Sequence, residues 1–268
     1  DGSNASETFN IMANGGRVLL TRDVANVTMD LNDVERIELS TLGGADNVVI
    51  GDLSGTDLTQ IELDLRGSNG GGDGAIDRVA VNGTQGADNV TIVGDTGGVL
   101  IFGLPAQINL FQTDAGDQLV VNGQGGDDVI NAQGLDAGAV QLTINGGLGN
   151  DLMVGSDGDD LITGGDGNDV ALMGAGDDTF AWNPGDDNDV VEGQAGFDAL
   201  LFNGANVAET INIAANGGRV LFTRNIATVT MDLNDVERIQ FNALGGADTI
   251  AIGDLSGTDA TEVTVNLA

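Results

Sequence analysis

The chain lacks cysteine, histidine and lysine, and each absence excludes a kind of chemistry. Without cysteine there is neither a disulfide nor a thiolate ligand. Without histidine the usual general base and the commonest transition-metal ligand are missing. Two prolines and 3% aromatic residues leave a thin core of valine, isoleucine, leucine and alanine. No apolar run approaches the length that spans a bilayer.

Acidic residues far outnumber basic ones. The 268 residues include 42 aspartates and glutamates against eight basic residues, all arginine, and the formal net charge is −34. No basic residue lies between Val79 and Gly218, so the acids there have no salt-bridge partner within that segment. They must be solvated or paired with bound cations. This charge makes nucleic acid and anionic membrane surfaces unsuitable partners.

Glycine is abundant, with 44 residues, and it recurs in a nine-residue period from Gly146 to Leu201. Successive segments read GGLGNDLMV, GSDGDDLIT, GGDGNDVAL and MGAGDDTFA, followed by a lengthened WNPGDDNDVVE and by GQAGFDALL. Glycine recurs at the first, second and fourth places, an acid at the sixth and usually an apolar residue at the eighth. This pattern is typical of a parallel β-helix that binds calcium.

Each part of the nonapeptide has a physical role. The first six residues turn sharply, which glycine permits because it adopts positive φ without a Cβ penalty. The last three form one short strand, with the eighth side chain on one face and its neighbours on the other. The eighth-place residues are Met153, Ile162, Ala171, Phe180 and Leu200. Two nonapeptides complete one coil, so alternate repeats stack on the same side.

The sixth-place acids then form two columns of like charge. They are Asp151, Asp160, Asp169, Asp178, Asp187 and Asp198. Stacked carboxylates repel each other unless a cation lies between them. Carboxylate and carbonyl oxygens without thiol or imidazole suit a hard cation, and a flexible loop favours Ca²⁺ over Mg²⁺. The sequence therefore predicts several bound calcium ions.

Other interpretations of this segment explain less of it. A disordered Gly/Asp-rich linker does not require an apolar residue every nine places. An EF-hand has a twelve-residue spacing with a closing glutamate, which is absent. Lone Asp-Gly pairs usually form simple turns, but here the pairs are periodic.

Degenerate forms of the pattern occur outside this segment. GTQGADNVT keeps Asp88 and GQGGDDVIN keeps Asp128, and both are candidate metal ligands, with a turn-capping aspartate as the alternative. Similar segments carry an acid at Glu7, Asp46, Glu209 and Asp248. We interpret these as rungs of the same solenoid, most of which no longer bind metal.

A second, much longer period is also present. Residues 2–66 recur as residues 204–268 with roughly two thirds of positions identical. The predicted organisation is a flanking module (1–66), degenerate repeats with a Gly-rich loop (67–145), a calcium-binding roll (146–201) and a second copy of the flanking module (202–268). The predicted fold class is all-β, a parallel β-solenoid of short parallel strands without substantial helix.

The nonapeptides resemble the haemolysin-type calcium-binding repeat, also called the RTX repeat, specifically over Gly146–Leu201 and more loosely elsewhere. The flanking block, ANGGRV…DLNDVER…GGAD…GDLSGTD, resembles a module found beside such repeats in large bacterial secreted proteins. The resemblance implies a parallel β-roll, export through a one-step (type I) secretion channel, and folding outside the cell on meeting calcium. The start at Asp1, without a methionine, agrees with a piece of a longer or processed polypeptide.

The resemblance also implies ligands, with each ion between one turn and the next turn on the same side. The implied carboxylates are Asp151, Asp160, Asp169 and Asp178. The implied carbonyls are those of Gly146, Leu148, Gly155, Asp157, Gly164 and Asp166. Pro184 and two extra residues interrupt the fifth repeat, so Asp187 and Asp189 compete for one ligand position. Phe197 stands where Asp or Asn is usual and makes Asp198 the weakest ligand of the set.

We expect a calcium-stiffened structural module of an extracellular surface layer, adhesin or filament, one that associates with itself end to end or laterally. The long-period repeat and the lack of an obvious polar cap at either end support this. The alternative is an accessory or ligand-binding roll, for glycan or host surface, within a larger secreted enzyme or toxin. Catalysis in this chain is not expected, because no HExxH, phosphate loop or nucleophile elbow occurs.

One outer face of the predicted roll is more apolar than the other. It would carry Leu152, Val154, Val170 and Leu172, whereas the opposite face would carry Leu161, Thr163, Thr179 and Ala181. The apolar face is a candidate association patch. Ordinary strand propensity is the alternative explanation.

Overall fold

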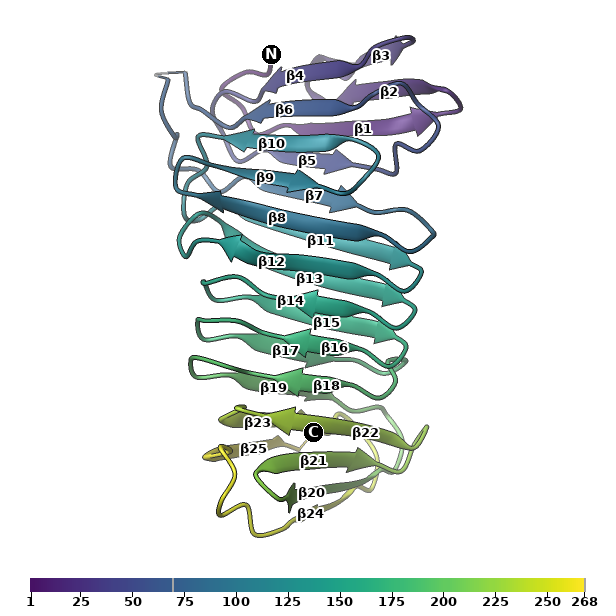
Figure 1. Cartoon of the computed structure of the whole chain (residues 1–268), viewed down its shortest axis with the longest axis vertical. Coiled ribbons are helices and arrows are strands. Elements are labelled where there is room, and N and C mark those ends of the chain that lie inside the picture. Colours follow the sequence, from purple (N-terminus) through teal and green to yellow (C-terminus); the bar gives the residue numbers. More distant parts are fainter. Residues whose placement is uncertain (69, 268) are drawn as a thin grey trace.

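Two long β-sheets lie against each other along the whole molecule and form a flattened column, with the N-terminal module at one end and the C-terminal module at the other (Figure 1). The computed structural model describes residues 1–68 and 70–267, so Asn69 of the Gly-rich loop and Ala268 of the second module lie outside the described residues. Within those ranges the one helical segment is a 3-10 turn at Val24–Asn26. In the described part of the chain, no helix has the length and apolar character needed to cross a membrane.

Strands alternate between the two sheets along the chain, except where three consecutive strands stay in one sheet. The first sheet contains β1 (Thr8–Asn14), β2 (Arg17–Arg22), β3 (Val27–Leu31), β5 (Asn47–Ile50), β7 (Arg78–Asn82), β11 (Gln118–Gly125), β13 (Gln141–Leu148), β15 (Leu161–Asp166), β17 (Thr179–Trp182), β19 (Ala199–Asn203), β23 (Arg238–Asn242) and β25 (Glu262–Asn266). The second sheet contains β4 (Arg36–Ser40), β6 (Gln60–Asp64), β8 (Asn89–Asp95), β9 (Gly98–Phe102), β10 (Gln107–Phe111), β12 (Val129–Leu135), β14 (Leu152–Val154), β16 (Val170–Leu172), β18 (Val190–Glu192), β20 (Thr210–Asn216), β21 (Arg219–Arg224), β22 (Val229–Asn234) and β24 (Thr249–Ile252).

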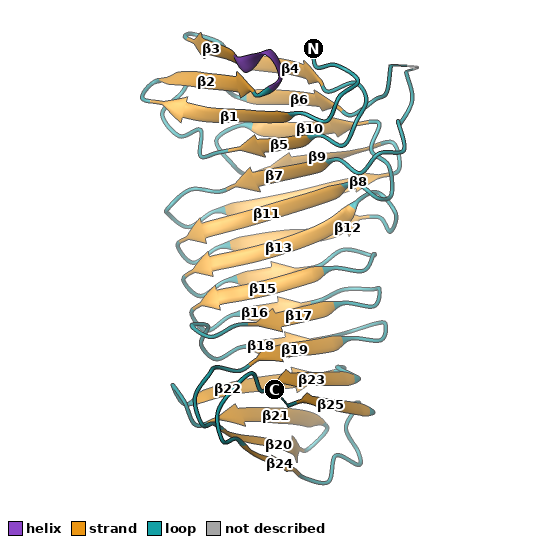
Figure 2. Ribbon diagram, turned by 180° about the vertical axis from the view of Figure 1, so that it is seen from behind, coloured by secondary structure: helices purple, strands orange, loops and turns teal. Residues whose placement is uncertain are grey.

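The nonapeptide segment forms the regular middle of the column. Alternate repeats stack in parallel register: Leu152 pairs with Val170 in the second sheet, and Leu161 pairs with Thr179 in the first (Figure 2). Every eighth-place side chain named above is 0% exposed, because the period of two directs it into the space between the sheets. The predicted parallel β-roll is therefore confirmed.

Three antiparallel meanders interrupt the parallel pattern, and the sequence interpretation did not include them. They are β1–β2–β3, β8–β9–β10 and β20–β21–β22. In the first, Gly15 and Gly16 separate β1 from β2, and Gly15 has φ 65°. Gly217, with φ 67°, occupies the same place in the third. A two-residue Gly-Gly connection favours a hairpin, since glycine supplies the positive φ that the first central residue needs in a type II′ turn, which suits strand twist.

The two copies of the flanking module occupy opposite sheets. Meander β1–β2–β3 lies in the first sheet, whereas its counterpart β20–β21–β22 lies in the second. Likewise β4 belongs to the second sheet and its counterpart β23 to the first. The two copies are thus related by an odd number of half-coils along the column.

An aromatic cluster joins the roll to the second flanking module. Trp182 and Phe202 stack with their ring centroids 4.0 Å apart, and Phe222 lies 4.3 Å from Phe202. All three side chains are 0% exposed. The Trp182 indole N–H donates to the Asp187 carbonyl at 2.9 Å, so the lengthened fifth repeat also anchors the ring.

We predict that Phe202→Ala destabilises the protein by about 3–5 kcal/mol, the usual cost of removing a fully buried phenylalanine. The control is Phe102→Ala on β9, whose side chain is 40% exposed and for which we expect a loss below about 1 kcal/mol. Urea titration of both variants at saturating calcium measures the difference. Equal losses would contradict the assignment of Phe202 to the junction core.

Candidate metal centres

Aspartates that directly precede strands of the second sheet form a hydrogen-bonded ladder through the roll. The Asp128 backbone N–H donates to Oδ1 of Asp151 at 2.8 Å, and the Asp151 N–H donates to Oδ1 of Asp169 at 2.8 Å. The Asp169 N–H continues the ladder to Oδ1 of Asp189 at 3.0 Å, and the Asp88 N–H begins it at Asp128. Each coil thus presents its carboxylate to the backbone of the coil before it.

A matching ladder precedes strands of the first sheet. The Asp160 N–H donates to Asp178 at 2.8 Å, the Asp178 N–H to Asp198 at 2.9 Å, and the Asp198 N–H to Glu237 at 2.7 Å. Val140, which directly precedes β13, stands between this run and an N-terminal run. The N-terminal run links Glu7, Asp46, Asp77 and Asp117 in the same way.

The ladder bonds use only one carboxylate oxygen of each residue. The second oxygen is buried and has no hydrogen-bond partner among the described residues at Asp46, Asp128, Asp151, Asp169, Asp178, Asp189 and Asp198. Leaving one buried charged oxygen unpaired costs free energy that no basic residue of this segment offsets. A row of such oxygens is the arrangement that a column of bound cations would satisfy.

Glycine at the first place of most repeats keeps the space beside these oxygens open, although Met173 and Trp182 begin the fourth and fifth repeats. A Cβ at Gly146 would lie 2.3 Å from Oδ2 of Asp151 and 2.6 Å from the carbonyl oxygen of Gly164 in the next coil. A Cβ at Gly164 would lie 2.2 Å from Oδ2 of Asp169. Carboxylate and carbonyl oxygens from successive turns therefore converge where a side chain is absent. This oxygen-only donor set fits Ca²⁺.

Burial raises the pKa of several ladder aspartates, and neighbouring acids add to the effect. The pKa rises to about 8 at Asp178, to about 8 at Asp189 and to about 7 at Asp169. It rises to about 6 at Asp128 and at Asp198. Without cations, part of the ladder therefore holds protons at neutral pH. A cation that binds the carboxylates must displace them.

Serine or threonine at the second place changes the site. The Ser156 backbone N–H donates to Oδ2 of Asp160 at 2.6 Å, and its hydroxyl donates to Oδ1 at 2.9 Å. Thr84 makes the equivalent pair of bonds to Asp88. Both oxygens of these two aspartates are already partnered, so Asp88 and Asp160 suit a cation less well than the glycine-flanked positions do.

The structure separates the two competing residues of the fifth repeat. Asp189 is 2% exposed and occupies the ladder position, whereas Asp187 is exposed and contributes its carbonyl to Trp182. Asp198 also occupies a ladder position, below Asp178.

Of the carbonyls implied by the family resemblance, four lie in the last residues of β13 and β15 and two, those of Gly155 and Asp157, lie in a turn. Not all of them are free. The Leu148 carbonyl accepts the Gly126 N–H, and the Asp166 carbonyl accepts the Gly149 N–H, both at 2.8 Å. Each still has a second lone pair. Gly155 and Ser156 are buried in their turn, while the Asp157 side chain points to solvent.

Within the described ranges, no three acidic, histidine or cysteine side chains gather in one metal-binding group. Any ion at these turns would therefore take much of its coordination from backbone carbonyls. A search for clustered acidic side chains does not find a site of that kind.

The N-terminal run contains two ladder residues that sequence reasoning missed, Asp77 and Asp117. Each stands at the sixth place of an irregular segment, GDGAID and QTDAGD, and each directly precedes a strand. The available signal was an acid immediately before an alternating apolar run. Neither segment has the full set of glycines of the nonapeptide pattern, so the pattern did not identify these aspartates.

Comparison with known proteins supports the repeat assignment. Residues 143–180 match the family model of the RTX calcium-binding nonapeptide repeat, in four copies. This chain therefore carries RTX-type repeats in the regular part of the roll. No curated protein matches the chain.

We predict that the metal-free protein loses stability as pH rises from about 4 to about 8. The folded-state pKa values of Asp169, Asp178 and Asp189 lie above the unfolded value of 3.8, so the folded state binds more protons in this window. Far-ultraviolet circular dichroism of the chain in chelator between pH 8 and pH 5 tests this, with calcium-saturated protein as the control. The β signal in chelator should grow as the pH falls, because protons then neutralise the carboxylates that calcium otherwise pairs. Calcium should flatten the dependence, because bound ions keep the carboxylates ionised. A β signal in chelator that grows as the pH rises over this window would contradict the prediction.

Proposed function

We propose that the two aspartate ladders bind several Ca²⁺ ions between successive coils and that this binding drives folding of the roll. The observation that carries the proposal is the row of buried Oδ2 atoms without partners, from Asp128 to Asp198. Asp128, Asp151, Asp169 and Asp189 supply carboxylates on one edge, and Asp178 and Asp198 on the other.

Calcium supplies positive charge that offsets the repulsion between stacked carboxylates. The chain supplies the oriented ligands and the space for the ion. The ladder N–H groups orient each carboxylate, and the first-place glycines leave room for the ion. Without the ion, a net charge of −34 keeps the repeats expanded. With it, folding follows calcium concentration by mass action, with affinities on the order of 10⁻⁴–10⁻³ M for extracellular modules.

This affinity suits a protein that stays unfolded in a low-calcium cytoplasm and becomes rigid outside the cell. We therefore propose an extracellular or cell-surface location after type I secretion, as the RTX resemblance implies. The role is that of a structural module in a surface layer, adhesin or filament, without catalysis of its own. A long column of coils stacked one on the next supports this role.

The first experiment is a calcium titration followed by far-ultraviolet circular dichroism and light scattering. We expect the β signal to rise with calcium and to fall again with chelator. Growth in particle size alongside it supports a filament or surface layer, whereas a compact monomer supports the accessory-module alternative. A full β signal that ignores both calcium and chelator would overturn the folding switch.

The ladder assignment predicts that Asp169→Asn weakens calcium binding roughly tenfold, because one ligand charge is lost next to an ion. Asp157→Asn is the matched control, since it removes the same charge from a side chain that points to solvent. Isothermal titration with calcium compares the two variants with wild type. Equal affinities for all three would remove Asp169 from the ligand set.

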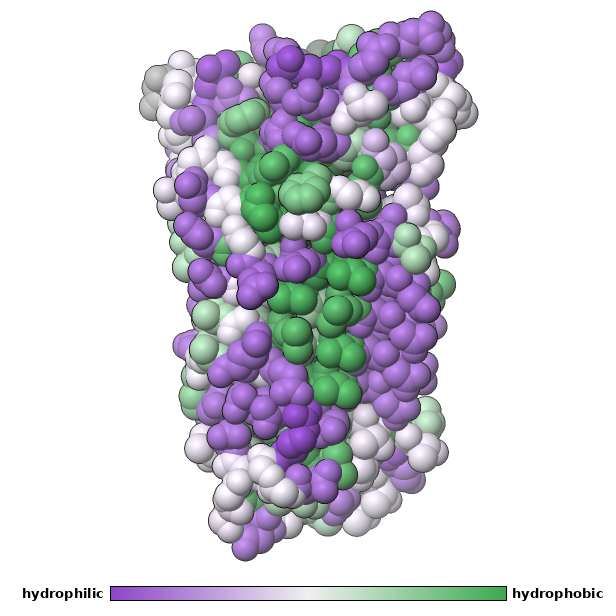
Figure 3. Space-filling model, viewed as in Figure 1, coloured by the Kyte–Doolittle hydropathy of each residue, from purple (hydrophilic) through white to green (hydrophobic). Residues whose placement is uncertain are grey.

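An apolar surface on the second sheet supports lateral association. Figure 3 shows an apolar stripe over the middle of the second sheet, flanked by polar residues. Leu152, Val154, Val170 and Leu172 are half-buried on the outer face of β14 and β16, with their side chains alternating with core residues. We propose this stripe as a contact between parallel columns.

Leu172→Asp should abolish calcium-dependent growth in particle size if the stripe forms that contact. Thr163→Asp on β15 is the control, since this half-buried residue places the same new charge on the opposite sheet. Light scattering at saturating calcium gives the readout. Unchanged assembly of the Leu172 variant would remove the stripe from the interface.

A further inference from the structure

The third strands of the three meanders differ in their neighbours. Strand β10 pairs in parallel with β6, and β22 pairs in parallel with β18. Strand β3 instead ends the first sheet, and β4 ends the second sheet beside it. In the second copy, the counterpart of β4 is β23, and it pairs in parallel with β19 of the roll. The N-terminal end of the column therefore presents two strand edges whose counterparts are both covered.

An apolar groove of about 330 Å³ lies between these two edges. Its lining includes Leu20, Met29, Leu31, Val34 and Leu39, which we call the N-terminal socket. The Met29 side chain is 46% exposed. The groove is thus the open end of the hydrophobic core.

The second copy shows the same socket filled. The counterparts are Phe222, Met231, Leu233, Val236 and Phe241, and each is at most 2% exposed. The filling group is Phe202 of β19, whose ring lies 4.3 Å from Phe222 and 6.0 Å from Phe241. Trp182 stacks behind Phe202. Met29 is 46% exposed, whereas its counterpart Met231 is 0% exposed because the roll covers the second socket.

The ion pairs near the socket also differ between the two copies. In the second copy, Arg219 contacts Asp232 at 2.6 Å and Glu192 of the roll at 2.7 Å. In the first copy, Arg17 contacts Asp30 at 2.7 Å and remains 41% exposed at its side chain. An acidic group at the position of Glu192 would complete the contacts of Arg17.

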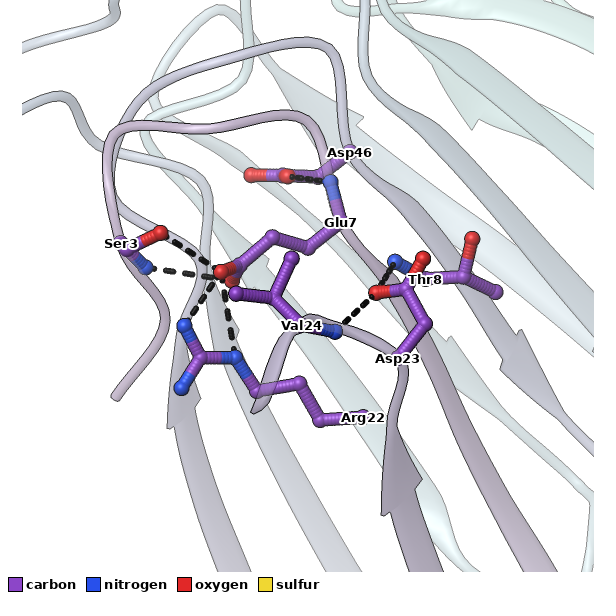
Figure 4. A network of polar contacts seen from close by, with 7 residues as sticks. All are labelled: Ser3, Glu7, Thr8, Arg22, Asp23, Val24 and Asp46. Atoms are coloured by element: carbon purple, nitrogen blue, oxygen red, sulfur yellow. Dashed lines mark hydrogen bonds and ion pairs between the residues drawn. The ribbon is translucent and has the colours of Figure 1, made fainter. Parts of the chain in front are cut away.

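The arginine at the floor of the socket is also in place. Arg22 is held by Glu7, which Ser3 contacts from the other side (Figure 4). In the second copy the equivalent pair is Arg224 and Glu209, and the Arg224 guanidinium lies 5.1 Å from the centre of the Trp182 ring. Arg22 of the first copy is thus held in the position from which Arg224 contacts the Trp182 ring.

We propose that the N-terminal socket docks the last coil of an RTX roll placed ahead of it in an array of such units. The docking coil is of the type that β18 and β19 form, with two parallel strand edges, a phenylalanine that stacks on a tryptophan of the strand before them, and a carboxylate. β3 would pair with the first strand and β4 with the second, as β22 and β23 do. The proposal rests on the structural role proposed above and takes up the end-to-end association expected from the sequence, and the fit itself does not depend on calcium at the ladders.

A chimera tests the fit directly. In it, residues 204–268 are replaced by a second copy of residues 2–66, so that the first socket follows the roll. Trp182 is the only tryptophan and reports on the junction. We expect its emission maximum and its protection from a soluble quencher to match those of wild type. Red-shifted, quencher-accessible emission from a chimera that retains its β signal would overturn the proposal.

Matched substitutions separate docking from general instability. Met231→Asp should lower the melting temperature by roughly 5–10 °C, because it places a charge in a filled socket. Met29→Asp in wild type should change it by less than about 2 °C, since that socket is open. The same substitution in the transplanted copy of the chimera should behave like Met231→Asp. A transplanted substitution without effect would show that the roll does not enter the socket.

Calcium titration of wild type distinguishes the two proposals. If its β signal ignores calcium while the chimera protects Trp182, the folding switch fails and the docking proposal stands. If wild type responds to calcium and the chimera leaves Trp182 exposed, the docking proposal fails alone.

Discussion

The stacking of buried carboxylates is the constraint on which the rest of the structure depends. Each ladder bond, such as that from the Asp151 N–H to Asp169, ties one coil to the next at the place where the chain turns. The same bond leaves the other oxygen buried and unpaired. The coil is therefore held together by groups that also repel each other. Burial beside other acids makes the ionised carboxylates unfavourable and so raises their pKa values. A divalent cation between them would offset this repulsion.

The composition follows from this arrangement. In the roll, a strand of three residues such as β14 or β16 buries only one side chain, so the apolar core between the sheets is thin there. A core that thin requires close approach of successive turns, and a Cβ at Gly167 would lie 1.7 Å from the Gly149 carbonyl oxygen. Few aromatic side chains fit such a core. Most of the largest ones gather where the roll meets the second flanking module.

The flanking modules act as connectors between rolls because of their meanders. A meander steps ahead by two strands and returns, so that its third strand meets the preceding coil. This path places Phe222 and Phe241 against Phe202 and leaves the first copy with an open counterpart. Stiffening by calcium and joining through sockets would together make a continuous column from such units.

Sequence by itself determined the period, and with it the all-β class, the parallel roll and the inward direction of Met153, Ile162 and Phe180. These depend on local steric rules, glycine at positive φ and alternation along a strand, which a single repeat already expresses. The tertiary structure alone decided that Asp189 rather than Asp187 joins the ladder, because the lengthened turn shifts the register by an amount that only stacking on Asp169 defines. It alone decided that Ser156 closes off Asp160, and that Asp77 and Asp117 continue the ladder without the glycine pattern. The bonds from Ser156 to Asp160 stay within one turn. Hydrogen bonds between coils about twenty to forty residues apart place Asp189, Asp77 and Asp117 in the ladder, and such contacts leave no local periodicity in the chain.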